Sequence, residues 1–187
     1  MIGSLPTALE VGGRLWDIRT DIRVVLGIFQ AFNDPELTDR EKAYVCVKCL
    51  YADLDDIPAE DMQEAVEKAF WFCNGGDTPK EEQDVKVIDW EHDEHIIFPA
   101  ISRALGVTDI RSLPYMHWWT FCGAFGELPE SSVLSTVISL RRKMGRHEKL
   151  EKYEQEIIRK NRTLIDMPKR LTAEEQAEYD FVDSLFY

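Results

Sequence analysis

The spacing of hydrophobic and polar positions changes along the chain. Near the N-terminal end, over residues 8–17, the pattern predicts a β-hairpin. Two short segments with apolar residues, 8–11 and 14–17, flank Gly12-Gly13. A Gly-Gly pair between such segments is typical of a two-residue hairpin turn, because glycine adopts the positive φ angles that the turn needs. From about Thr20 the apolar residues take helical spacing, and Asn33-Asp34-Pro35 should end that helix.

Two further helices are predicted in the first half of the chain. Thr38 and Glu41 have the spacing of a capping box, so a helix should begin there and run to about Tyr51. A third helix should begin after Pro58, which suits a first helical turn, and end at Asn74-Gly75-Gly76. The first half is therefore predicted to be a small helical bundle.

The second half is predicted to be helical too, after a polar loop at 77–86 that lacks any periodicity. Helices are expected at about 90–105, 112–124 and 131–144, separated by turns that contain glycine or proline. The fold class that follows is mostly α: a helical bundle with a small N-terminal β-hairpin and charged C-terminal helices.

The last forty residues differ in character from the rest, which suggests a division of the chain. We expect a helical domain with the hairpin at 1–145 and a segment of charged amphipathic helices at 146–187. One helix should cover about 147–162 with a single narrow apolar stripe. Pro168 should end it, and Thr172 with the glutamate three residues later should cap a final helix.

Apolar positions that a partner could cover occur in this tail and in an aromatic cluster at 115–122. In the tail they lie on narrow stripes of charged helices, which a helical partner could bury. In the cluster, the two adjacent tryptophan side chains on a helix point about 100° apart, so each must be buried against a different surface. The partner-binding candidates are Trp118, Trp119, Tyr153, Ile157, Phe181, Leu185 and Phe186.

The charge composition argues against two classes of binding partner, nucleic acids and anionic membranes. The 187-residue chain carries 35 acidic and 22 basic residues, a formal net charge of −13. This charge opposes direct binding to nucleic acid or to an anionic membrane, since both repel an acidic surface. The chain also has no long uncharged apolar segment and no signal-peptide pattern, so a cytoplasmic location is expected.

The sequence gives little indication of a catalytic site or a metal-binding site. His92 and His95 lie in an acidic run, but no second helical motif of metal ligands accompanies them, so a solvated acidic helix start is the expected structure. Cys46 and Cys49 fall in the middle of a predicted helix and should be buried structural residues. No NTPase or hydrolase motif occurs. We expect no catalytic residues, no metal and no cofactor.

Several short motifs between residues 89 and 141 together resemble the bacteriophage gene-product-fifteen family. The helical first half, the opening hairpin and the charged helix after residue 141 agree with that family in character. The motifs that carry the resemblance are Asp89-Trp90-Glu91, Ile97-Phe98, Gly106-Val107, His117-Trp118-Trp119, Leu128-Pro129-Glu130 and Val137-Ile138-Ser139-Leu140-Arg141.

The resemblance implies a non-catalytic tail assembly chaperone of a long-tailed phage or prophage, working in the cytoplasm of the bacterial host. The implied partners are the tape measure protein and the tail tube protein, with a sibling tail assembly protein as a further candidate. Self-association of the chain is also expected, because linked weak contacts along a long client raise avidity. Two alternatives stay open at this point. One is a permanent minor structural component of the tail, and the other is a metal-dependent enzyme.

Overall fold

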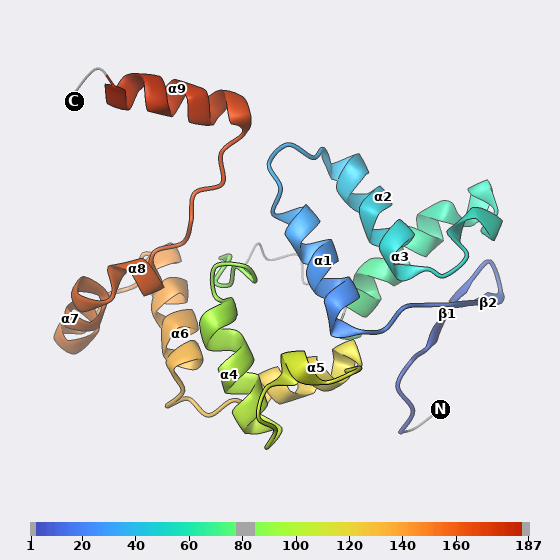
Figure 1. Cartoon of the computed structure of the whole chain (residues 1–187), viewed down its shortest axis with the longest axis horizontal. Coiled ribbons are helices and arrows are strands. Elements are labelled where there is room, and N and C mark those ends of the chain that lie inside the picture. Colours follow the sequence, from blue (N-terminus) through green and yellow to red (C-terminus); the bar gives the residue numbers. More distant parts are fainter. Residues whose placement is uncertain (1–2, 78–84, 185–187) are drawn as a thin grey trace.

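A computed structural model describes residues 3–77 and 85–184 as a mostly helical protein with a small β-hairpin near its N-terminal end (Figure 1). The fold class predicted from the sequence is therefore confirmed. Most of the predicted loop at 77–86 lies outside the described residues. Within the described ranges, none of the helices combines the length and the apolar character that a membrane span requires.

The predicted hairpin is present with the predicted turn. Strand β1 (Ala8–Val11) pairs antiparallel with β2 (Arg14–Asp17). Gly12 and Gly13 connect the strands with φ angles of 58° and 72°, a conformation that residues with a Cβ atom rarely adopt. Leu9 points inward and is buried in the main core, so the hairpin covers one end of the helical body.

Three helices follow the hairpin as the sequence predicts. They are α1 (Ile22–Phe32), α2 (Asp39–Leu50) and α3 (Met62–Cys73). The capping box is formed: the Thr38 side chain accepts from the Glu41 N–H, and the Glu41 carboxylate accepts from the Thr38 N–H. Helix α2 packs against both α1 and α3. Two 3₁₀ turns precede α3, Leu54–Asp56 (η1) and Ala59–Asp61 (η2).

The second half contains α4 (Glu94–Ala104), α5 (Trp118–Gly126) and α6 (Val133–Gly145), with a 3₁₀ turn, η3, at 110–112. All three helices begin later than predicted, at residues 94, 118 and 133 in place of about 90, 112 and 131, and the delay is largest for α4 and α5. Before α4, the Asp93 carboxylate accepts from a backbone N–H four residues earlier and holds a turn. Before α5, the His117 ring accepts from the backbone N–H two residues later and caps the helix.

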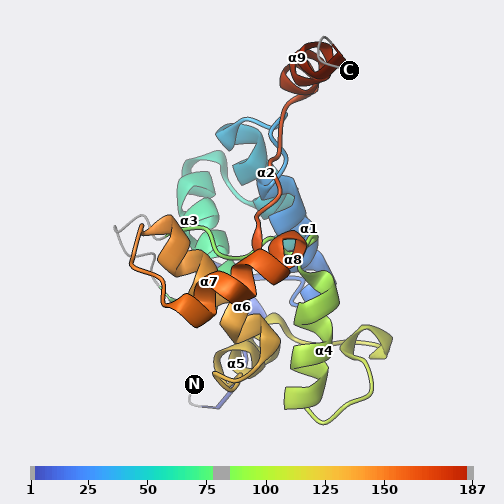
Figure 2. The same cartoon turned by 90° about the vertical axis from the view of Figure 1, so that its left-hand side faces the viewer.

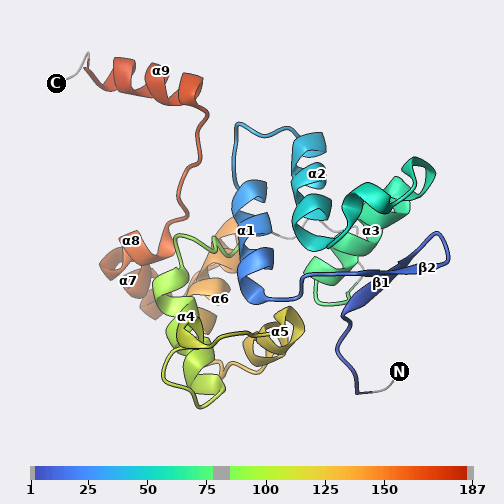
Figure 3. The same cartoon turned by 45° about the vertical axis from the view of Figure 1, so that its right-hand side comes forward.

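The adjacent tryptophans tie the two halves of the chain together. Trp118 is 2% exposed, and its indole N–H donates to the Cys73 carbonyl at 2.9 Å. Trp119 is partly buried, donates to the Phe72 carbonyl at 3.0 Å and stacks on the Phe72 ring. Both indole N–H groups thus donate to carbonyls at the C-terminal end of α3. These hydrogen bonds join α5 to the first half of the chain. Figure 3 shows α1 between α2 and the second-half helices.

The C-terminal helices are α7 (Lys152–Lys160), α8 (Arg162–Ile165) and α9 (Ala173–Ser184). Helix α8 packs against α6 and buries Ile165. Part of the C-terminal segment therefore docks on the helical body. The domain division at residue 145 stays a prediction. Beyond its first residue, which contacts Glu36, helix α9 stands clear of the helical body in two perpendicular views (Figure 1, Figure 2).

Alanine substitutions should separate the roles of the two tryptophans. Trp118→Ala removes a buried ring and its hydrogen bond, so we expect the free energy of unfolding to fall by about 3–5 kcal/mol. Trp119→Ala removes a ring that is already partly hydrated and should cost roughly half as much. Urea denaturation of both variants measures the difference, and equal losses would contradict it.

Candidate partner-binding surface

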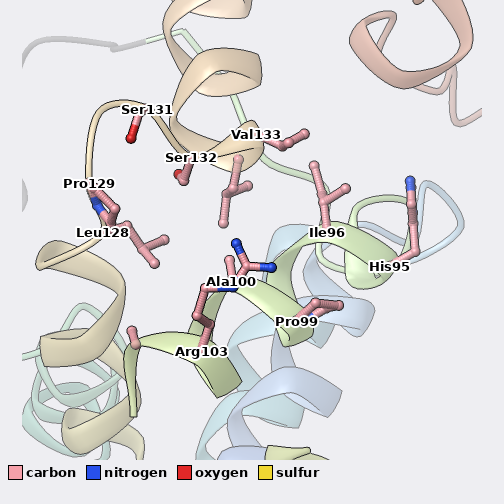
Figure 4. A pocket seen from close by; sticks show the side chains of 12 residues that line it. His95, Ile96, Pro99, Ala100, Arg103, Leu128, Pro129, Ser131, Ser132 and Val133 are labelled. Atoms are coloured by element: carbon pink, nitrogen blue, oxygen red, sulfur yellow. The ribbon is translucent and has the colours of Figure 1, made fainter. Parts of the chain in front are cut away.

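An apolar surface that water reaches lies beside the N-terminal end of α6. There a hollow of about 490 Å³ separates α4 from α6. Figure 4 shows Leu128 and Pro129 on one side of the hollow and Ile96 and Pro99 on the other. Val133, the first residue of α6, contributes to its wall and is 59% exposed. The hollow is therefore lined by apolar side chains that water reaches.

Two further hollows continue this surface along α6. One, of about 240 Å³, lies between α6 and α8 and shares Val133 with the first. The other, of about 600 Å³, lies between α6 and α7 and shares Leu140 and Ile157 with the second. We call the three adjoining hollows the α6 groove. Tyr153, which is 64% exposed, stands at the α7 end of this groove.

The walls of the α6 groove are held in place by an ion pair between α6 and α7. The Lys143 ammonium donates to Glu154 Oε1 at 2.6 Å, and Glu154 is 4% exposed. Glu154 also accepts from the Glu151 N–H at the start of α7. Because α7 is tied down at its first turn, the apolar residues on its inner face keep a fixed distance from α6.

The structure brings together two of the residues predicted to bind a partner and separates the others. Tyr153 and Ile157 line the α6 groove. Trp118 is inside the core, and Trp119 is half covered by α3. Phe181 lies on α9 and is 63% exposed. The last two candidates, Leu185 and Phe186, lie outside the described residues.

Several groove residues were missed by sequence reasoning. Val133 is adjacent to the buried stripe of α6, which begins with Leu134, so its exposure follows from the helical period once the start of α6 is known. Ile96 and Leu128 are partly buried and belong to different elements. No sequence signal places residues from α4, the turn before α6, and α7 around one groove, because their contacts are tertiary.

Behind the groove, α6 is anchored by a buried ion pair. The Arg141 guanidinium donates to both carboxylate oxygens of Asp93, at 2.5 and 2.9 Å, and these side chains are 3% and 0% exposed. It also donates to the carbonyls of Val87, Leu164 and Ile165. The expectation of a solvated acidic helix start is therefore wrong for Asp89 and Asp93, which are buried and paired with arginines, while Glu91 and Glu94 are exposed.

A second buried carboxylate holds the segment that leads to α9. Asp89 is 1% exposed and accepts two hydrogen bonds from Arg170, at 3.0 and 2.7 Å. Burial acts to raise the pKa of Asp89, but the hydrogen bonds from Arg170 and from the His92 N–H, with the nearby Lys86 charge, outweigh it and lower the pKa to about 2. The Arg170 guanidinium reaches Glu91 as well.

The histidines and cysteines that the sequence singled out are not gathered into one site. His92 Nε2 lies 4.0 Å from Asp93 Oδ1, whereas His95 lines the α6 groove. Cys46 is buried, as predicted, and Cys49 is partly buried. Across residues 3–77 and 85–184, no three side chains of histidine, cysteine, aspartate or glutamate are arranged to hold a metal ion.

Comparison with known proteins identifies a matching family. A family described as "Bacteriophage Gp15 protein" matches residues 1–167, which include the hairpin, α1 to α8 and the whole α6 groove. No curated protein and no solved structure matches the chain. Helix α9 lies beyond the matched range.

Removing the charge of Asp93 should strongly destabilise the fold. In Asp93→Asn the Arg141 guanidinium stays buried without its counter-charge, so we expect a loss of about 3–5 kcal/mol in unfolding free energy. The same substitution at Asp166, which is half exposed and 3.6 Å from Arg162, is the control and should change stability by less than about 0.5 kcal/mol. Chemical denaturation at pH 7 compares them, and similar small losses would argue against the anchor.

The Asp89–Arg170 pair predicts a specific dependence of stability on pH. Because the pKa of Asp89 is lowered to about 2, its stabilising contribution is present above its ordinary value near 4 and is lost as the pH falls toward 2. Arg170→Gln should remove that contribution. Wild type should then be more stable than the variant at pH 7, and this difference should shrink between pH 4 and 2. A difference that stays constant over this range would contradict the assignment.

Proposed function

The chain belongs to the bacteriophage Gp15 protein family, and from this premise we propose that it is a tail assembly chaperone. In this role it binds the tape measure protein while the phage tail is built in the cytoplasm of the host cell, and the tail tube protein is a second client. It catalyses no reaction. A sibling tail assembly protein is a further partner, and neither nucleic acid nor a membrane is bound directly.

The α6 groove is the observation that carries the proposal. A tape measure protein is expected to be a long helix, and a helix presents apolar side chains one turn apart along one face. The groove offers successive hollows along α6, of which the first two are lined mainly by apolar residues. Val133 stands exposed where these two hollows meet, and Tyr153 stands exposed at the α7 end of the third. A client helix lying along α6 would cover both residues and remove their apolar surface from water.

Charge supports the same role. A helper that binds apolar client surface must keep the complex dispersed until the tube forms. The net charge of −13 repels other complexes of the same kind and opposes their aggregation. In the first two hollows of the groove, by contrast, apolar residues dominate, and Arg103 and His95 supply basic groups near the α4 end. The overall negative charge thus keeps the complex in solution, while the apolar residues of the groove bind the client.

Co-expression with the tape measure protein tests the proposal. We expect the variant Val133→Ser with Tyr153→Ser to bind the client about tenfold more weakly and to yield less soluble client, since two exposed apolar contacts are lost. Its own stability should change little, because both side chains are already exposed. Pull-down of the client and denaturation of the free variant provide the two measurements.

The matched control is Leu15→Ser with Tyr44→Ser. These residues are 75% and 58% exposed and lie on β2 and α2, outside the α6 groove. The control should hold the client as well as wild type does. An equal loss in the control, or full binding by the groove variant, would overturn the assignment of the groove. Mass spectrometry of purified phage particles tests the alternative role. A chaperone should be absent from the particles, and a permanent tail component should be present.

A further inference from the structure

Charge is distributed unevenly along the C-terminal part of the chain. Residues 141–170 contain 11 of the 22 lysines and arginines but only 5 acidic residues. Residues 173–184, which form α9, contain 5 acidic residues and no basic one. A strongly basic segment is thus followed directly by an acidic helix, although the protein as a whole is acidic.

The acidic helix is held away from its own basic segment. Arg170 is bound by Asp89 and Glu91, and the Ala173 N–H at the first turn of α9 donates to Glu36. These two attachments hold the segment before α9 and the first residue of the helix on the helical body. In Figure 2, α9 points away from α7 and α8, so the basic segment of the same chain does not cover it.

One face of α9 combines an aromatic ring with negative charge. Glu174, Glu178 and Phe181 follow one another at intervals of four and three residues, so they share a face of the helix. Phe181 is 63% exposed, and both glutamates are exposed. A surface that received this face would need an apolar recess with positive charge beside it.

Helix α7 presents a surface of this kind. A hollow of about 250 Å³ is lined by Leu150, Gln155, Ile158, Arg159 and Arg162. Leu150 and Ile158 are partly exposed and supply the apolar floor. Arg159 has no ion pair within the described residues, and Arg162 has only a distant, exposed one. This α7 hollow shares no lining residue with the α6 groove.

We propose that α9 of one copy of the chain docks on the α7 hollow of a second copy. Phe181 enters the hollow, whose volume suits one aromatic side chain, while Glu174 and Glu178 pair with Arg159 and Arg162. Each copy donates one helix and receives one, so the contact is heterologous and builds an open row or a closed ring. The inference does not depend on the chaperone role, because it concerns the chain alone.

Measurement of molar mass as a function of salt gives the first test. At roughly 0.05 M salt, where screening is weak, light scattering coupled to size exclusion should give a mass above the 21.7 kDa of one chain. At roughly 1 M salt, where the screening length falls to about 3 Å, the mass should approach that of one chain. A single-chain mass at low salt and high protein concentration would overturn the proposal, and so would association that salt leaves unchanged.

Charge reversal on each side gives the decisive test. The hollow variant, Arg159→Glu with Arg162→Glu, and the arm variant, Glu174→Lys with Glu178→Lys, should each be a single chain at low salt. Mixed in equal amounts, they should associate again, because the reversed arm now fits the reversed hollow, and the two unreversed surfaces also match. Failure of the mixture to associate, with both variants folded by circular dichroism, would overturn the pairing.

The control reverses two basic residues elsewhere. Arg40→Glu with Lys42→Glu changes the net charge as much as the hollow variant does, and both residues lie on α2. This control should still associate at low salt. If it becomes a single chain, net charge and not the α7 hollow governs association, and the proposal fails.

Discussion

The ion pair between Asp93 and Arg141 is the interaction on which the second half of the structure depends. It joins the turn before α4 to the C-terminal part of α6, and the same guanidinium binds carbonyls at the C-terminal end of α8 and before α4. Five hydrogen bonds satisfy the buried arginine, which offsets the unfavourable desolvation of the two charges. Four chain segments thereby acquire one fixed arrangement, and the α6 groove is the space that this arrangement leaves between them.

Local features of the fold could be predicted from the sequence because they rest on contacts between near neighbours. The Gly12-Gly13 turn and the Thr38–Glu41 capping box are both of this kind, and both are present. The buried ion pair could not be predicted, since Asp93 and Arg141 are 48 residues apart and each resembles a solvated charge when it is read in its own helix. Reasoning from sequence alone therefore found the elements but assigned Asp89 and Asp93 the wrong environment.

The candidate site was predictable only in part, for the same reason. Tyr153 and Ile157 were found because a narrow apolar stripe on a charged helix is visible in sequence, and both line the α6 groove. The tryptophan pair was found because two large aromatic residues are adjacent in the sequence. Its indole N–H groups donate to carbonyls at the end of α3, and Trp118 is buried in the core. Aromatic content identifies residues that organise a structure, while their exposure is decided by distant segments.

The separation of the two proposed surfaces has a functional consequence. The α7 hollow and the α6 groove have no lining residue in common, so a row of copies joined through α9 would keep every groove open. Each groove alone would bind a client helix weakly, but grooves linked in a row would bind a long helix with much higher avidity, because the later contacts become intramolecular. The family match ends at residue 167, before α9. Self-association through α9 would thus be an addition to a groove that the family-matched part of the chain already contains.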